Sequence, residues 1–393
     1  MAAYIIGYTV IAVIILFVVF SVLVKKRIIF GETVAVQKIF GHPLLHYSLR
    51  RVGSSLISIS LAIIVTFFLI RLAYPAKEIC LSFFASPKNP EGSELYTLLC
   101  NTWKEQMGYN GSMIQQLLNF FYNILPFPKT VCKTELITFV DKPSMFQIFE
   151  CRNFVINFGT VYKINGTADG SFAIDYILPR MWTSFRIGFI AVVLELGLGY
   201  PFGILMARFQ NGIFDKIGKT YIMTIDAIPG VAYYYIWMAI LCGLFALPRK
   251  YEEGNFVSWL PLILTMGFTG MSGIGLWVRR YMIDEFNADY VKFARSKGLE
   301  EGRIMRIHIL RNAIVPLVRT FPSAVIGALM GTYYLEKIYS VSGIGGALLV
   351  ATDTKNASLL IAIIIISALL SVISYLLGDI VTAMVDPRIS FTK

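Results

Sequence analysis

Long apolar stretches constrain this chain more than any other feature of its sequence. Each of seven stretches holds about 20 or more mostly apolar residues, the length that an α-helix needs to cross the hydrocarbon core of a bilayer. Charged residues make up only 15% of the 393 residues, against about 25% in soluble proteins. We therefore expect an all-α membrane protein with about seven transmembrane helices. The stretches are Ala3–Val24, Ser54–Tyr74, Thr183–Ala207, Thr220–Leu247, Ser258–Val278, Ala313–Leu335 and Ser358–Met384.

Basic residues predict how these helices are oriented. They collect in the loops after the first, third and fifth stretches, and the chain has a formal net charge of +11. Loops rich in Lys and Arg stay on the cytoplasmic side, which places the N-terminus outside and the C-terminus in the cytoplasm. The first stretch is not expected to be a cleaved signal peptide, because its basic residues follow it. No soluble domain carries a basic face, so nucleic acid is not an expected partner.

A less apolar segment, residues 76–176, separates the second and third stretches. The alternation of loops puts it outside the cytosol, and roughly 100 residues suffice for a small domain. Cysteines outside the cytosol favour disulfides, and four cysteines allow three pairings; buried free thiols are the alternative. The four cysteines of this segment are Cys80, Cys100, Cys132 and Cys151.

Two acidic residues within the apolar stretches, Glu195 and Asp226, are candidates for a substrate pathway. A carboxylate in hydrocarbon is costly, so each should face protein or a water-filled cavity. The alternative for both is an interhelical hydrogen bond or salt bridge. Gly199 and Gly203 are four residues apart, a spacing that predicts close helix packing.

Two sequence patterns could indicate a phosphate-binding loop or a metal site, but neither fits the spacing or the ligands that such a site needs. The sequence Gly218–Thr220 resembles the end of a phosphate-binding loop, but five residues separate Gly212 from Gly218 where that loop has four. His42 and His46 have no nearby set of Cys or carboxylate ligands. We therefore predict no catalytic residue, no metal site and no bound cofactor in this chain.

The loop 279–312 is too long for a simple connection. Its sequence from Asp289 to Lys297 favours a helix, and Gly298 suits the position just after the last turn of one. A second helix is expected to lead into the sixth stretch. A short helix that lies across the membrane face is a good docking surface for a partner protein.

This loop resembles the ATPase-coupling loop of binding-protein-dependent (type I) ABC importer permeases, and within them the oligopeptide, dipeptide and nickel branch. That branch carries Tyr-x-x-x-Ala-Arg-x-Lys-Gly-Leu, followed by His-x-Leu-Arg-Asn-Ala-x-x-Pro. Of the general Glu-Ala-Ala signature the chain keeps only the last alanine, as that branch often does. The matching residues are Tyr290, Ala294, Arg295, Lys297, Gly298, Leu299, His308, Leu310, Arg311, Asn312, Ala313 and Pro316.

Three further segments resemble the same permeases: Tyr47–Arg51, Glu336–Gly345 and Asp386–Ile389. The resemblance covers about 44–75 and 177–390, so it implies a six-helix core to which the first stretch and the 76–176 segment are additions. The expected domains are 1–43 (extra N-terminal helix and linker), 44–75 (first core helix), 76–176 (extracytoplasmic insert domain) and 177–393 (the remaining five core helices, with the coupling loop 279–312).

The resemblance implies a subunit without its own ATPase site that forms half of the pore for oligopeptides, in a bacterial plasma membrane. Its partners would be a homologous second permease, two ABC ATPases that bind ATP and Mg, an extracellular binding protein that delivers the peptide, and membrane lipid. The expected ATPase-coupling residues are Asp289, Tyr290, Phe293, Ala294, Arg295, Lys297, Gly298 and Leu299. The residues expected to brace the loop are His308, Arg311 and Asn312.

Two alternatives to oligopeptide import remain. A nickel or metal-chelate permease belongs to the same branch, and clustered His or Met in the pore would favour it; no such His cluster is present in the sequence. A ligand-sensing channel or receptor is a different class of protein, and it leaves the loop 279–312 unexplained.

Overall fold

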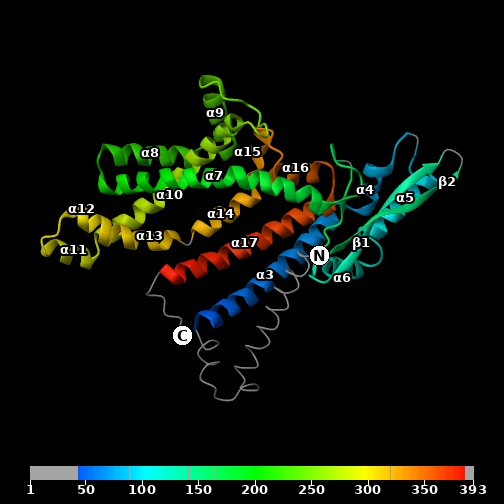
Figure 1. Ribbon diagram of the computed structural model, residues 1–393, viewed down its shortest axis with the longest axis horizontal. Coiled ribbons are helices and arrows are strands. Elements are labelled where there is room, and N and C mark those ends of the chain that lie inside the picture. The colour runs from blue at the N-terminus through cyan, green and yellow to red at the C-terminus, as the bar shows by residue number, and fades with distance from the viewer. Residues whose placement is uncertain (1–42, 88, 140–141, 163, 319, 386–393) are drawn as a thin grey trace, which may run out of the picture. The chain divides into compact units, whose positions relative to one another are not determined.

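The computed structural model describes residues 43–87, 89–139, 142–162, 164–318 and 320–385 (Figure 1). The predicted first span, Ala3–Val24, and the C-terminal segment Asp386–Ile389 lie outside these residues. The described chain forms two compact units. One takes in the chain up to Leu178 together with Leu348–Ala368, and the other takes in Pro179–Ala347 together with the chain from Leu369.

Helices dominate both units. The elements of the first unit are α3 (Pro43–Ala73), α4 (Ala76–Phe84), α5 (Glu94–Gln106), α6 (Met113–Ile124), β1 (Lys129–Phe139), β2 (Lys142–Phe154), β3 (Thr160–Val161) and β4 (Ser171–Phe172). Those of the second are α8 (Ile213–Ala227), α9 (Gly230–Met238), the π-helix η1 (Ala239–Leu244), the 3₁₀-helix η2 (Phe256–Trp259), α10 (Leu260–Phe286), α11 (Asp289–Ser296), α12 (Glu301–Arg303), the π-helix η3 (Ile304–Ile309), α13 (Leu310–Val318), α14 (Thr320–Met330) and α15 (Tyr333–Ile338). The helices with residues in both units are α7 (Ala173–Arg208), α16 (Ile344–Asp353) and α17 (Ala357–Val385).

The described residues contain four helices long and apolar enough to cross a membrane, or up to six if each of two bent helix pairs is one span. Each of the six stretches predicted from Ser54 onward overlaps one of these candidates. The multi-pass helical architecture is therefore as predicted, and the strands β1–β4 of the first unit are an addition that the sequence did not indicate. The candidates are Leu56–Ala73, Ala173–Arg208, Phe256–Phe286, Ala357–Asp379, the pair Ile213–Ala227 with Gly230–Leu244, and the pair Glu301–Val318 with Thr320–Ile338.

Of the two bent helix pairs, the one formed by α8 and α9 with η1 departs further from a straight helix. Where the sequence predicts a helix over Thr220–Leu247, the chain turns by 112° between α8 and α9. Ile228 is extended, with φ −86° and ψ 130°, and Pro229 follows it. Proline has no N–H to donate and disfavours the helical conformation of the residue before it, which explains the break.

In the second unit, α7 and α10 pack closely through glycines. A Cβ added at Gly199 would lie 2.7 Å from the Cβ of Ile274, and one at Gly203 would lie 2.6 Å from the Cβ of Val278. Such distances are too short for any side chain, so the two helix backbones approach as glycine pairs allow. The packing role predicted for Gly199 and Gly203 is confirmed.

In the first unit, the insert segment (residues 76–172) follows α3. Ser93 caps α5 by accepting a hydrogen bond from the Tyr96 backbone N–H at 3.2 Å. Ser112 and Gln115 form a capping box at the start of α6, which satisfies two N–H groups that the first turn leaves without helix partners. N-terminal caps of this kind stabilise the first turn of a short helix that has only a small hydrophobic core around it.

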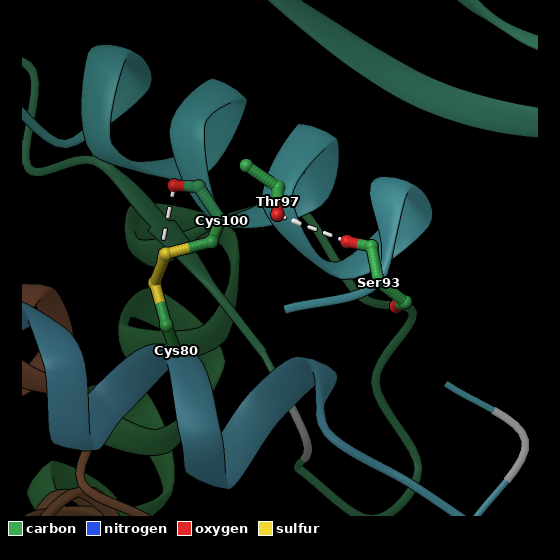
Figure 2. The surroundings of a disulfide bond; sticks show 4 residues. All are labelled: Cys80, Ser93, Thr97 and Cys100. Carbon is green, nitrogen blue, oxygen red and sulfur yellow. Dashed lines mark hydrogen bonds between the residues drawn. A yellow bond between two sulfur atoms is a disulfide. The ribbon is translucent and has the colours of Figure 1, made fainter. Parts of the chain in front are cut away.

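Disulfides connect neighbouring elements of the insert segment. Cys80 on α4 is bonded to Cys100 on α5, and both are buried (Figure 2). Cys132 and Cys151 face each other on β1 and β2 and are also bonded. The two strands pair antiparallel as a long ribbon (Figure 1). Of the three pairings that the sequence allows, the structure has Cys80–Cys100 with Cys132–Cys151.

Candidate partner-docking loop and substrate cavity

Helix α11 ends at a glycine turn. Gly298 has φ +76°, a left-handed conformation that costs glycine little. Its N–H donates to the Arg295 carbonyl at 2.9 Å, and the Leu299 N–H donates to the Ala294 carbonyl at 3.3 Å. This pair of bonds is the Schellman arrangement, and it turns the chain sharply away from α11. The helix and its end at Gly298 are where the sequence predicts them.

One face of α11 anchors it in the second unit. Val291 is fully buried and Ala294 is 4% exposed. Both belong to a hydrophobic cluster shared with the ends of α7 and α10, with η3 and with α13. Burial of apolar surface contributes about 25 cal/mol per Å², so the position of α11 is tied to the transmembrane helices around it. A force on α11 would therefore be transmitted to them.

The other face of α11 is exposed. Phe293 is 60% exposed, and the ammonium of Lys297 lies 4.4 Å from the centre of its ring. Lys292 donates to Asp289 at 2.8 Å, and Arg295 donates to both carboxylate oxygens of Glu301, at 2.7 and 3.3 Å. An aromatic ring surrounded by charges of both signs, on a rigidly anchored helix, is a surface that a partner protein could bind.

The residues after α11 are linked to it by hydrogen bonds. The Tyr290 hydroxyl bonds to the carboxylate of Glu285 and lies 3.4 Å from the His308 carbonyl oxygen, to which it can donate. The Asn312 amide donates to the same carbonyl at 3.0 Å. The structure thus brings Tyr290, His308 and Asn312 together through the backbone of His308. Arg311 is exposed.

A buried ion pair joins the ends of α8 and α10. Asp215 is fully buried, and its carboxylate accepts from the Arg279 guanidinium at 2.6 and 3.0 Å. Lys219 lies 2.9 Å from the same carboxylate, and the Asn211 backbone N–H donates to it at 2.9 Å. Sequence reasoning counted these charges only as loop charges. The available signal was a single acid in a basic loop, four residues before Lys219.

A second feature of this unit is a cavity of about 240 Å³. Glu195, half-buried on α7, lines it together with Glu336 on α15 and with residues of α10 and α14. Glu195 is thus placed at a cavity, one of the two settings expected for a carboxylate in a span. Asp226 does not line this cavity and is exposed beside the bend at Pro229.

Glu336 is held by the backbone around it. It is 4% exposed, and its carboxylate accepts from the Ser184 hydroxyl at 2.7 Å and from the Gly346 N–H at 3.0 Å. A Cβ added at Gly343 would lie 2.3 Å from a carboxylate oxygen of Glu336. This close approach is the physical reason for glycine in the Glu336–Gly345 segment. The sequence pointed to that segment but not to the buried carboxylate within it.

The described residues contain no group of three or more His, Cys, Asp or Glu side chains placed to hold a metal ion. Cys242, the fifth cysteine, is a buried free thiol on η1. Its Sγ lies 3.6 Å from the Pro248 carbonyl oxygen, consistent with a small packing residue.

Comparisons with known proteins identify the family. Residues 199–391 match the model of "Binding-protein-dependent transport system inner membrane component". The oligopeptide transport system permease protein AmiC of Streptococcus pneumoniae serotype 4 is 36% identical over 223 residues, which are 56% of this chain and 45% of AmiC. The dipeptide transport system permease protein DppB of Lactococcus lactis subsp. cremoris is 30% identical over 253 residues, which are 64% of this chain and 82% of DppB. An inward-facing structure of the MetNI methionine ABC transporter aligns with a TM-score of 0.42 and 14% identity, over 54% of this chain and 97% of that one.

The fold and the anchored loop define a multi-pass α-helical membrane protein. The match to DppB covers most of that relative, and together with the family model it decides the assignment. The chain belongs to the family of inner membrane components of binding-protein-dependent transport systems. It spans under half of the length of AmiC.

Proposed function

We propose that this chain is the permease subunit of an ATP-driven importer and forms half of the pore through which oligopeptides enter the cell. The observation that carries this proposal is α11, whose Val291 and Ala294 are buried in the core while Phe293 is exposed. A helix fixed on one face and open on the other can transmit the movement of a partner to the spans. The names of AmiC and DppB support a peptide as the cargo.

In this proposal α11 binds in a groove on an ABC ATPase subunit. Two such ATPases would bind ATP and Mg, so that hydrolysis occurs outside this chain. ATP binds the closed ATPase pair better than the open pair, and this difference in affinity is what shifts the population of pore conformations. The proposed coupling residues are Asp289, Tyr290, Phe293, Ala294, Arg295, Lys297, Gly298 and Leu299; of these, Ala294 is buried and would act by anchoring the helix. His308, Arg311 and Asn312 are the proposed bracing residues.

The other proposed partners follow from the same mechanism. A homologous second permease would complete the pore, and an extracellular binding protein would deliver the peptide. Within the plasma membrane, the N-terminus would lie outside and the C-terminus in the cytoplasm. The charge of the loops supports this orientation.

The cavity at Glu195 is the proposed peptide path in this chain. Its volume of about 240 Å³ is smaller than the 300–1,000 Å³ of typical ligand pockets, so it would hold one end of a peptide and not the whole molecule. A carboxylate there would attract the ammonium group at the peptide N-terminus, a feature that peptides of any sequence share. Asp226 would act at a different point of the path, because it does not line this cavity.

The test is capture of the ATPase from mild detergent by the tagged chain, together with uptake of labelled oligopeptides by cells. Phe293→Asp should lower capture at least tenfold, because a charge replaces the exposed ring, and uptake should fall with it. Gly298→Arg should have the same effect by straining the turn. The matched control is Phe209→Asp, whose ring is 51% exposed in the connection after α7.

Separate outcomes distinguish docking from transport. Glu195→Gln should leave capture of the ATPase unchanged and lower uptake of peptides that have a free N-terminal ammonium. Acetylated peptides, which lack that charge, should be affected much less. Full capture of the ATPase by Phe293→Asp, or an equal loss of capture in the Phe209→Asp control, would contradict docking through α11. Uptake of nickel without uptake of peptides would contradict peptide as the cargo and favour nickel.

A further inference from the structure

Helix α6 of the insert segment exposes apolar side chains on a side that the described residues do not cover. No charged residue occurs between Glu105 and Lys129, a stretch that contains the whole helix. Along α6 and its C-terminal cap, a spacing of four, four and three residues puts four exposed apolar side chains on one side, and a neighbouring side carries amides. The exposed apolar side chains are Ile114, Leu118, Tyr122 and Leu125, and the amides are Gln115, Gln116, Asn119 and Asn123. Such a helix needs apolar surroundings on its open side.

The third side of α6 faces two membrane-spanning helices of its unit. The ring of Phe120 lies 5.2 Å from that of Phe67, near the end of α3 that leads into the insert segment (Figure 1). Phe120 also lines a cavity of about 50 Å³ together with Ile361 on α17. Phe67 comes six residues before its candidate span ends at Ala73, and Ile361 comes four residues after its own begins at Ala357. At about 1.5 Å per residue these positions are roughly 9 and 6 Å inside the spans. The helix thus lies at the depth of the outermost turns of both.

Backbone groups at both ends of α6 have partners within the chain. At the start, Ser112 and Gln115 form the capping box. At the end, the buried ammonium of Lys129 donates to three carbonyls. These belong to Tyr122, Asn123 and Leu125, the last two at 2.7 and 3.1 Å. A helix that lies against hydrocarbon cannot leave such groups to water, so these contacts suit α6 to surroundings of low polarity.

We propose that α6 lies in the surface of the bilayer, on the side of the membrane where the insert segment is, with its exposed apolar side among the lipid acyl chains. Amphipathic helices of this kind bury an apolar face about 5 to 10 Å into the boundary between headgroups and acyl chains. That range matches the roughly 6 to 9 Å by which Phe67 and Ile361, beside Phe120, lie inside their spans. The amides of α6 then face the headgroups and water.

The surroundings of α6 favour lipid over a protein partner. The last turns of α3 expose Leu69 (60%) and Leu72 (72%), so the apolar surface of that span continues at the level of α6. Tyr122 suits the boundary of a bilayer, where tyrosine is enriched. The helix has no charged side chain with which to orient a soluble partner. Without charge, its attachment depends on apolar area and not on anionic lipid.

The proposal is tested on the purified full chain in lipid nanodiscs by electron paramagnetic resonance. A nitroxide is attached to Leu118→Cys or, as the matched control one residue on, to Asn119→Cys. Both are made in a Cys242→Ser background, in which the four remaining native cysteines are disulfide-bonded. Oxygen partitions into acyl chains, whereas a neutral nickel chelate stays in water. The ratio of oxygen to nickel collision rates should be severalfold higher for Leu118→Cys, and it should be the same in neutral and in anionic lipid.

A second label checks that the apolar side holds the helix in place. With the nitroxide at Ile114→Cys, Leu118→Glu should raise nickel collisions severalfold, because a charge disfavours the acyl chains, and Leu118→Met should not. The proposal is overturned if the nickel chelate reaches Leu118→Cys as often as Asn119→Cys, since the apolar side would then be open to water, as a docking site for a soluble protein is. It is overturned as well if neither probe reaches Leu118→Cys, since protein would then cover that side, either the predicted span Ala3–Val24 or another chain.

Discussion

The buried charged side chains of the two units have opposite signs and different kinds of partner. Four charged side chains are buried within the described part of the chain. In the first unit both are cations, Arg71 and Lys129, held by backbone carbonyls and aromatic rings. In the second unit both are carboxylates, Asp215 and Glu336, held by N–H groups, a hydroxyl and basic side chains.

The difference follows from the number of partners that each group needs. A carboxylate accepts bonds from any N–H around it, and helix starts and glycine turns supply several at once. A guanidinium has to find acceptors for five donors in one plane, and the last carbonyls of a helix rarely meet all of them. The second unit thus supplies hydrogen-bond donors to both of its buried carboxylates from its own groups. The first unit supplies acceptors for Lys129, whereas Nε and Nη1 of Arg71 have no hydrogen-bond partner among the described residues.

The largest effect should come from the carboxylate of Asp215. Asp215→Asn leaves Arg279 and Lys219 without their shared counter-charge, and removal of one partner from a buried ion pair costs about 3 to 5 kcal/mol. Unfolding of the full chain in mixed micelles measures this loss. Lys219→Gln should cost about 1 kcal/mol or less, because that side chain is 37% exposed. Equal losses in the two variants would show that Asp215 is not the centre of the cluster.

An intermediate effect is expected for the buried cation Lys129. Lys129→Met leaves three carbonyls at the end of α6 without their donor, and an unsatisfied buried group costs about 1 to 3 kcal/mol. The same unfolding measurement applies. Lys77→Met is the matched control, because Lys77 is 77% exposed and only pairs with Glu91 at 3.3 Å. A change no larger than in the control would mean that solvent replaces the ammonium without cost.

The smallest effect should come from the exposed pair at the start of α11. The hydrogen bond and the charge of Lys292 hold the pKa of Asp289 below its ordinary value. A lowered pKa stabilises the folded state at pH values above the unfolded pKa, and this contribution is lost as the pH falls through the folded pKa. We expect a carbon-13 NMR titration to show the carboxyl of Asp289 titrating below the ordinary value for aspartate. Lys292→Gln should return the pKa of Asp289 toward its ordinary value. If the pKa does not change, Lys292 is not what lowers it.

The transmembrane architecture could be predicted from the sequence because its signal is local. Each span is a continuous run of apolar residues, so hydropathy finds it without knowledge of its neighbours. The end of α11 could be predicted from an equally local signal, since Gly298 follows a helical stretch and favours a left-handed turn. The 112° bend at Pro229 was missed because a proline can either kink or end a helix.

The parts that could not be predicted depend on residues far apart in the sequence. Ser184 and Glu336 are 152 positions apart, and Asp215 and Arg279 are 64 apart. Nothing in the local pattern around Glu336 shows that its carboxylate is buried. Glu195 was singled out because it interrupts an apolar run, whereas Arg71, near the end of the predicted span Ser54–Tyr74, was not singled out.

The disulfides of the insert segment carry a consequence for how the chain is made. The bonded cysteines are 20 and 19 positions apart, and neither loop encloses the other. The first cysteine of each pair therefore bonds to the next cysteine to leave the ribosome, and the order of synthesis is also the order of correct pairing. Cys242 is synthesised only after all four of these cysteines. Oxidation during synthesis would produce the native pairs without an isomerase, before most of the later spans exist.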